Sequence, residues 1–302
     1  MPRLILRRYW SHLVIAWTMT ATICARWESG THLGPDTLPM AVIASWAWVL
    51  HCVSDLRVQV AEGFRAQHHT WNSILRSGPS HEPSPLYSAF VQRMRSTEEH
   101  LRAVAYSHRL HRLTIAFPDS WDQADDSRGA ASLQHGRHGH VWLGSNWFEP
   151  NATAHLPVVL EHELGHILRR DNLRSTMVQA AGVFLMVLAA AWLPLDIAFL
   201  AAAALRLLYT GWLWGSELAC DARAVRTCGR DAVIALWTHS AALQSTHPRP
   251  VRLWSGLCSA FTHPPYRLRI WWARRTDTPT THGPHPLATL HDACGHAPTY
   301  TE

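Results

Sequence analysis

Long uncharged windows divide the chain into apolar and polar stretches. Windows without Asp, Glu or Arg cover residues 9–25, 37–54 and 175–195, and a fourth runs over 197–207 with Arg206 as its one charge. About 20 apolar residues cross the hydrocarbon core of a bilayer, and 175–195 meets this length best. We therefore predict membrane spans in these windows. For the fourth window, where Arg206 would have to snorkel or pair, a buried helix of a soluble fold stays open as the alternative.

The stretches between these windows carry the periodicities of shorter elements. Residues 56–112 have apolar positions at helical spacing, and Gly and Pro residues over 78–85 break this region. Residues 113–117 and 140–143 are short apolar runs that predict strands. Few apolar residues remain over 276–302, which predicts a disordered tail. The pattern as a whole indicates a mainly α, α+β fold with a small β-sheet.

Composition supports a membrane protein and argues against a nucleic-acid partner. Charged residues make up 16% of the chain, against about 25% in an average soluble domain. Lys is absent, so all 27 basic residues are Arg, and they exceed the 22 acidic residues to give a net charge of +5. No aromatic-basic recognition motif accompanies this surplus, so we predict no nucleic-acid partner. Arg residues flanking apolar windows explain it better, with the lipid bilayer as the partner.

The segment His162-Glu163-Leu164-Gly165-His166 carries the clearest chemistry in the chain. Two His residues four positions apart lie on one face of a helix, so both imidazoles can bind one Zn²⁺. Glu163 lies about 100° round the helix, where its carboxylate can act as general base on a water held by the zinc. A catalytic zinc keeps three protein ligands and a water, and Glu217 is the best candidate for the third. We therefore predict one Zn²⁺ per chain and hydrolytic chemistry.

Three segments together resemble a known class of peptidases. V-V-L-E-H-E-L-G-H-I at 158–167 resembles the active-site helix of the HtpX-like and CAAX-prenyl-protease-like membrane zinc metallopeptidases. Glu217 followed by Asp221 is similar to their second motif, and H-P-P-Y-R-L-R-I at 263–270 is similar to a third. The stretch E-L-A-C-D that begins at Glu217 also resembles the sensor metallopeptidases of BlaR/MecR type. The subfamily therefore stays open.

The resemblance implies a zincin-like peptidase domain in an integral membrane protein with about four transmembrane helices. We expect an N-terminal transmembrane hairpin at 1–55, a helical juxtamembrane region at 56–112, a zinc peptidase domain at 113–275 with a transmembrane hairpin inserted near 176–214, and the tail at 276–302. Geometry also favours the inserted hairpin. Glu217 can share a zinc ion with the two His residues only if the intervening chain crosses the bilayer an even number of times.

Further roles follow for residues around the predicted zinc. Asp221, one helical turn after Glu217, would accept a hydrogen bond from a ligand imidazole and hold its tautomer. The resemblance adds Arg269 or His263 as the group that stabilises the oxyanion. Zinc peptidases of this class usually pair the substrate backbone with an edge strand, for which residues 141–144 are the candidate. An ordinary core strand is the alternative for this segment.

The uneven placement of Arg predicts the orientation in the cell membrane. Arg3, Arg7 and Arg8 precede the first span, whereas the loop at 26–36 carries a single Arg. The positive-inside rule places the N-terminus and the peptidase domain of this multi-pass protein in the cytoplasm. A signal peptide at the N-terminus is the alternative.

The predicted function is that of a membrane-bound zinc metalloendopeptidase acting on a protein or peptide substrate. The first alternative is a one-shot signalling or sensor metallopeptidase that cleaves a regulator or itself. A zinc-binding scaffold without turnover is a second alternative, against which the intact Glu163 argues. Two further His-rich loops are weaker metal candidates, and they comprise His135, His138 and His140, and His285, His291, Cys294 and His296.

Overall fold

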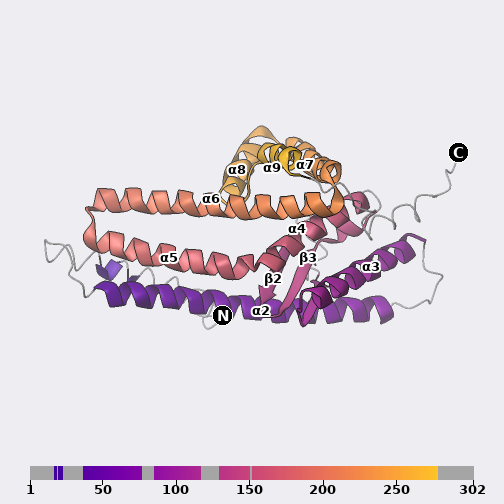
Figure 1. The fold of residues 1–302 in the computed structure, drawn as a ribbon, viewed down its shortest axis with the longest axis horizontal. Coiled ribbons are helices and arrows are strands. Elements are labelled where there is room, and N and C mark those ends of the chain that lie inside the picture. The colour runs from indigo at the N-terminus through magenta and orange to yellow at the C-terminus, as the bar shows by residue number, and fades with distance from the viewer. Residues whose placement is uncertain are drawn as a thin grey trace. The chain divides into compact units, whose positions relative to one another are not determined.

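The computed structural model describes residues 17, 18, 20–22, 37–76, 85–116, 129–149 and 152–277. The predicted first span and the predicted tail, with its His and Cys cluster, lie almost wholly outside these residues. The chain divides into two compact units, one formed by 1–58 with 171–214 and the other by 59–170 with 215–302. Helices dominate both units, and one small sheet lies in the second, as expected for a mainly α fold (Figure 1).

Among the described residues, three helices that contribute to the first unit are long and apolar enough to cross a membrane. They are α2 (Thr37–Arg76), α5 (Asp171–Trp192) and α6 (Leu195–Cys228), and in α2 the apolar part is Thr37–Ala61. Figure 1 shows α5 and α6 as an antiparallel pair. The connection at Leu193 and Pro194 is short, and acidic residues in the first turn of each helix complement the helix dipole. The helical hairpin predicted near 176–214 is therefore present.

Helix α2 is longer than the sequence pattern suggested. The predicted span at 37–54 and the predicted helix from residue 56 form one continuous helix, because no proline follows Pro39 before its end at Arg76. Helices α2 and α6 each begin in the first unit and continue into the second.

A chain of polar contacts links the apolar helices of the first unit. Trp48 Nε1 of α2 donates a hydrogen bond to Gln179 Oε1 of α5 at 3.0 Å, and Gln179 Nε2 donates to Ser175 Oγ at 3.0 Å. Ser175 Oγ lies 2.9 Å from Tyr209 Oη of α6. The guanidinium carbon of Arg206 lies 5.7 Å from the centre of the Tyr209 ring. Arg206 thus has an aromatic partner beside it within its apolar helix.

The second unit contains a three-stranded sheet with the order β1-β3-β2. Strand β1 (Arg112–Ala116) pairs in parallel with β3 (His138–Leu143), and β2 (Ala130–His135) pairs with β3 in an antiparallel hairpin. Gly136 makes this turn possible, because its φ of 60° is a left-handed conformation that glycine adopts without strain. Both predicted strands are confirmed, whereas β2 was not predicted.

The position of β3 decides between the two interpretations of residues 141–144. Strand β3 lies in the middle of the sheet, with a partner on each side, so the edge-strand interpretation is wrong and the core-strand alternative holds. The hairpin with β2 is the physical reason, since it covers the side of β3 that would otherwise have been free. Among the described strands, β2 is the edge that packs beside the helix carrying His162 and His166.

The first His-rich segment is a strand hairpin and not the predicted loop. His135 ends β2, His138 begins β3, and the two residues pair across the hairpin. His140 lies within β3 and is completely buried, and burial lowers its pKa from 6.5 to about 4. Buried neutral His140 is thus part of the core of the second unit.

Burial of His140 predicts an acid-sensitive core. The unfolded chain binds a proton at this residue below about pH 6.5, but the folded chain does so only near pH 4. Stability from this residue is therefore complete above pH 6.5 and is lost as the pH falls towards 4, by about 3 kcal/mol in total. In His140→Phe, the thermal unfolding midpoint should fall less between pH 6.5 and 4 than in wild type. The exposed control His138→Phe should show the same fall as wild type. Equal acid sensitivity of the two variants would contradict the assignment.

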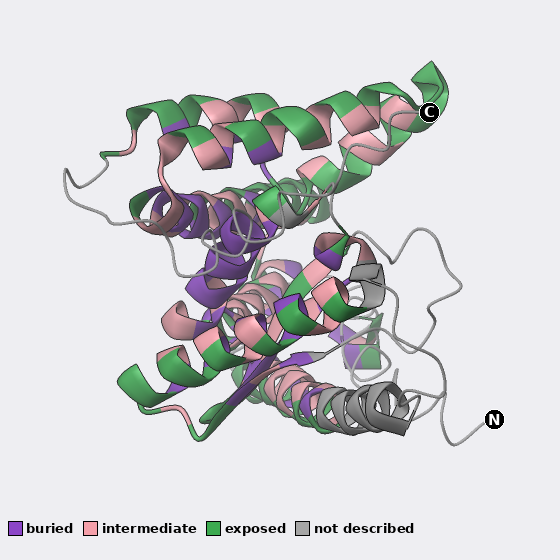
Figure 2. Ribbon diagram, turned by 90° about the vertical axis from the view of Figure 1, so that its right-hand side faces the viewer, coloured by how far each residue is buried: buried purple, intermediate pink, exposed green. Residues whose placement is uncertain are grey.

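In the described part of the second unit, five further helices and two 3₁₀ turns accompany the sheet. They are α3 (Pro85–Ser107), η2 (Ser145–Phe148), η3 (Thr153–His155), α4 (Leu156–Arg169), α7 (Arg230–Ser245), α8 (Arg249–Ala260) and α9 (Tyr266–Arg275). Helix α3 packs against β1 and α4 packs against β2, so the sheet and its helices enclose one apolar core. Figure 2 shows the buried residues in purple. Helix α4, which carries both predicted His ligands, packs within this core.

Candidate metal centre

Helix α4 is buried along most of its length because apolar residues surround its catalytic segment. Every residue from Leu156 to Gly165 is buried, including His162 and Glu163, and His166 is half-buried. Pro157 lies in the first turn, where its missing N–H costs nothing, and Arg170 in a left-handed conformation ends the helix. A helix is therefore present over 158–167, the segment that resembles an active-site helix, and it extends two residues further at each end.

Gly165 brings α4 and α6 into direct contact. A β-carbon at this position would lie 2.9 Å from Sγ of Cys220 and 3.1 Å from its Cα. Only glycine allows this approach without displacing a neighbour. Because Cys220 stands between Glu217 and Asp221 on α6, the contact carries both carboxylates to the His residues of α4.

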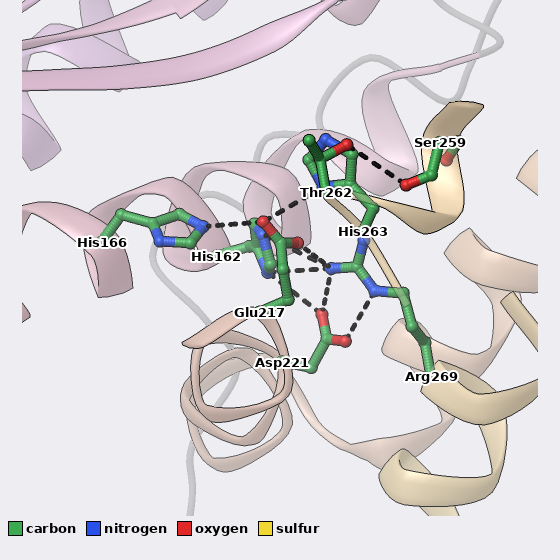
Figure 3. Close-up of polar contacts among 8 residues, drawn as sticks. All are labelled: His162, His166, Glu217, Asp221, Ser259, Thr262, His263 and Arg269. Atoms are coloured by element: carbon green, nitrogen blue, oxygen red, sulfur yellow. Dashed lines mark hydrogen bonds and ion pairs between the residues drawn. The ribbon is translucent and has the colours of Figure 1, made fainter. Parts of the chain in front are cut away.

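The three predicted ligands meet at one point (Figure 3). Oε2 of Glu217 lies 3.4 Å from Nε2 of His162, and Oε1 of Glu217 lies 3.5 Å from Nε2 of His166. Among the described residues, one ligand atom from each of the three falls within 4.8 Å of the others. Donors bound to zinc at about 2.0–2.1 Å in a tetrahedron stand about 3.4 Å apart. The spacing and the donor set of two imidazoles and one carboxylate thus fit a zinc ion.

Asp221 occupies the other side of the His162 ring. Nδ1 of His162 lies 3.0 Å from Oδ1 of the completely buried Asp221, and an N–H donated there leaves Nε2 free to face Glu217. Burial alone would lower the pKa of His162, but the hydrogen bonds to Asp221 and Glu217 outweigh it and raise the pKa. This contact puts Asp221 within hydrogen-bonding distance of His162, and its role in holding the tautomer stays a prediction.

Arg269 of α9 forms hydrogen bonds and a stacking contact with other residues of the protein. Its Nε and one terminal nitrogen each donate to Asp221 at 2.7 Å, and the same terminal nitrogen lies 3.3 Å from Glu217. The guanidinium carbon lies 3.4 Å from the centre of the Trp237 ring, and Arg269 is buried. These contacts make Arg269 a clamp on the two carboxylates of α6, which differs from the predicted oxyanion role.

His263 lies on the open side of the same cluster. Its Nδ1 is 3.2 Å from Oε1 of Glu217, and its side chain is 55% exposed. It precedes Pro264 and Pro265 in the turn between α8 and α9. Of the two residues considered for the oxyanion, His263 is the one with access to a substrate.

A second buried charge cluster on α4 was not predicted. Glu161, next to His162, is almost completely buried, and its carboxylate lies 2.9 Å from Nε2 of His100 in α3 and 2.8 Å from Arg223 in α6. The signal was present in the sequence, because a charged residue within the apolar run 157–164 needs a buried partner. The cluster ties α4 to both neighbouring helices.

Comparison with known proteins agrees with this geometry. Residues 135–275 match the family model of peptidase family M48, and this region contains the three predicted ligands together with Asp221, His263 and Arg269. The match confirms the family resemblance inferred from the motifs and indicates a metallopeptidase. Neither the curated proteins nor the solved structures gave a significant match to the chain.

Proposed function

From the premise that residues 135–275 match peptidase family M48, we propose that the chain is a membrane-bound zinc metalloendopeptidase. The observation that carries the proposal is the meeting of His162, His166 and Glu217, whose carboxylate oxygens lie 3.4 and 3.5 Å from the two imidazoles and whose donor atoms all lie within 4.8 Å of one another. Two imidazoles and one carboxylate leave a fourth position open, as in catalytic zinc sites and unlike closed structural ones.

The bound zinc would polarise the scissile carbonyl and make a water more acidic. Glu163 takes the proton of the attacking water and passes it to the leaving amine. Asp221 holds the tautomer of His162, and Arg269 in turn holds Asp221 through two hydrogen bonds. His263 donates a hydrogen bond to the negatively charged oxygen that develops on the substrate.

Strand β2 provides a surface for the substrate backbone. It is the edge of the described sheet that packs beside α4. An extended peptide can add to such an edge through main-chain hydrogen bonds, which makes recognition largely independent of side chains. We therefore place the scissile peptide along β2.

The apolar helices support a location in the cell membrane. Three of them have the length and composition of spans, and many of their large apolar side chains are exposed, among them Phe199, Leu200, Leu207 and Leu208. Such surfaces are favourable in lipid and unfavourable in water. The Arg distribution supports a cytoplasmic location of the peptidase domain.

Removal of the metal tests the proposal. The purified full chain should carry one zinc ion and cleave casein, lose cleavage when a chelator removes the ion, and regain it when zinc is restored. Glu217→Ala should lower zinc content and cleavage together, while the exposed control His138→Ala should change neither. Cleavage that persists in the metal-free chain would refute the zinc mechanism.

A further inference from the structure

Helix α8 exposes its apolar side chains to the surroundings. Leu253, Trp254 and Leu257 are 73%, 69% and 56% exposed, and Phe261, just after the helix, is 42% exposed. Positions 253, 257 and 261 follow helical spacing, and Trp254 lies beside them, so these four side chains form one stripe. We call them the α8 stripe. No residue of α8 is buried.

The residues of α8 that turn towards the protein are polar or small. Arg252, Ser255 and Gly256 are half-buried, and Ser255 Oγ donates to the Arg252 carbonyl at 3.2 Å. A helix on the surface of a water-soluble protein has the opposite arrangement, with its apolar face against the core. The inverted helix therefore calls for apolar surroundings on its outer side.

Charge around α8 indicates what those surroundings are. Between Asp231 and Asp277 the sequence contains no acidic residue and six Arg residues. Arg269 is buried against Asp221, which leaves five Arg residues at positions 249, 252, 267, 274 and 275. In α9, Trp271 and Trp272 are exposed, and the Arg275 guanidinium carbon lies 4.0 Å from the Trp271 ring centre. Exposed Trp and Leu combined with Arg are typical of helices that lie in the interface of an anionic bilayer.

We propose that α8 lies in the headgroup region of an anionic lipid bilayer, with the α8 stripe inserted among the acyl chains. The proposal rests on the membrane location proposed above, and it adds a contact distinct from the three candidate spans. Positive charge over 232–276 favours anionic lipid as the occupant over a second copy of the same chain, because two such surfaces repel each other.

Docking of α8 on the bilayer would also bring the metal centre close to the membrane surface. The turn after α8 carries His263, whose ring lies 3.2 Å from Glu217, and α9 then carries Arg269. Only Thr262 separates Phe261, the last residue of the stripe, from His263. Substrates would therefore be cut close to the headgroups, in segments adjoining the membrane.

Fluorescence quenching by labelled lipid tests the proposal in the full chain. In a background with the six native cysteines replaced, Leu257→Cys is labelled with a polarity-sensitive fluorophore. The matched control Ser259→Cys, about 200° round the same helix, is labelled in the same way. Vesicles of equal parts phosphatidylcholine and phosphatidylglycerol carry a nitroxide quencher on the acyl chain. The label at 257 should lose most of its emission and the label at 259 little, and vesicles of phosphatidylcholine alone should quench less.

The outcomes separate this proposal from the proposed membrane location. Flotation with vesicles tests the location, because the candidate spans alone would carry the chain to the lipid. A chain that floats but shows no quenching at 257 overturns the α8 proposal and leaves the location intact. Blue-shifted emission that depends on protein concentration and not on quencher would assign the stripe to contacts between copies, which also overturns it. Failure to float overturns both.

Discussion

Glu163→Gln should lower kcat by about 10²–10⁴-fold while the protein keeps its zinc. Glutamine has nearly the same shape as glutamate but cannot accept the proton of the attacking water. Glu163 is not one of the three residues whose donor atoms gather at the centre, so the metal should still bind. Steady-state cleavage of a labelled casein peptide and the zinc content of the purified variant measure the two effects.

The exposed Glu149 offers a matched control, since it lies outside α4. Glu149→Gln should cleave at the wild-type rate. Wild-type activity in a zinc-loaded Glu163→Gln variant would remove Glu163 from the mechanism. Counting product molecules per enzyme also separates a peptidase with many turnovers from a sensor that cuts once.

Arg269→Leu should destabilise the peptidase unit by about 3–5 kcal/mol. The substitution leaves Asp221 completely buried without the guanidinium that now donates two hydrogen bonds to it. Removing one partner of a buried ion pair strands the other charge in a medium of low dielectric constant. The stability of Arg269→Lys should lie between that of wild type and that of Arg269→Leu. Lysine keeps the positive charge but loses the planar guanidinium and its stacking on Trp237.

The thermal unfolding midpoint of the detergent-solubilised chain, followed without zinc, gives the effect on stability directly. Arg274→Leu is the control, because Arg274 lies on the same helix and is exposed. Equal midpoints for the two leucine variants would show that the clamp contributes nothing to stability. The contacts of Arg269 with Asp221 and Glu217 would then serve the metal site and not the stability of the fold.

Short-range sequence patterns were enough to find most of the centre. His162 and His166 share a helix face whatever the rest of the chain does, because the spacing of four is a local property of the α-helix. Glu217 and Asp221 were found in the same way, from spacing and resemblance. The apolar hairpin between the two motifs was predictable because its composition differs so clearly from that of its flanks.

The parts that sequence reasoning missed depend on contacts between distant segments. Strand β2 has the sequence A-A-S-L-Q-H, with little of the β-branched or aromatic character that favours strands, and it forms because β3 pairs with it. The clamp of Arg269 on Asp221 joins residues 48 positions apart. Nothing in the local pattern distinguishes a guanidinium that stabilises a transition state from one that stabilises a neighbouring carboxylate.

The contact at Gly165 bears on how the proposed zinc site would receive its ion. Backbone and side-chain atoms of α4 and α6 already touch at Cys220, so the packing of two helices sets the distance between the imidazoles and Glu217. The arriving ion need not draw the helices together, and little of its binding energy goes into reorganising the protein. Such a preformed site should bind and release metal without unfolding, so the metal-free chain should remain folded.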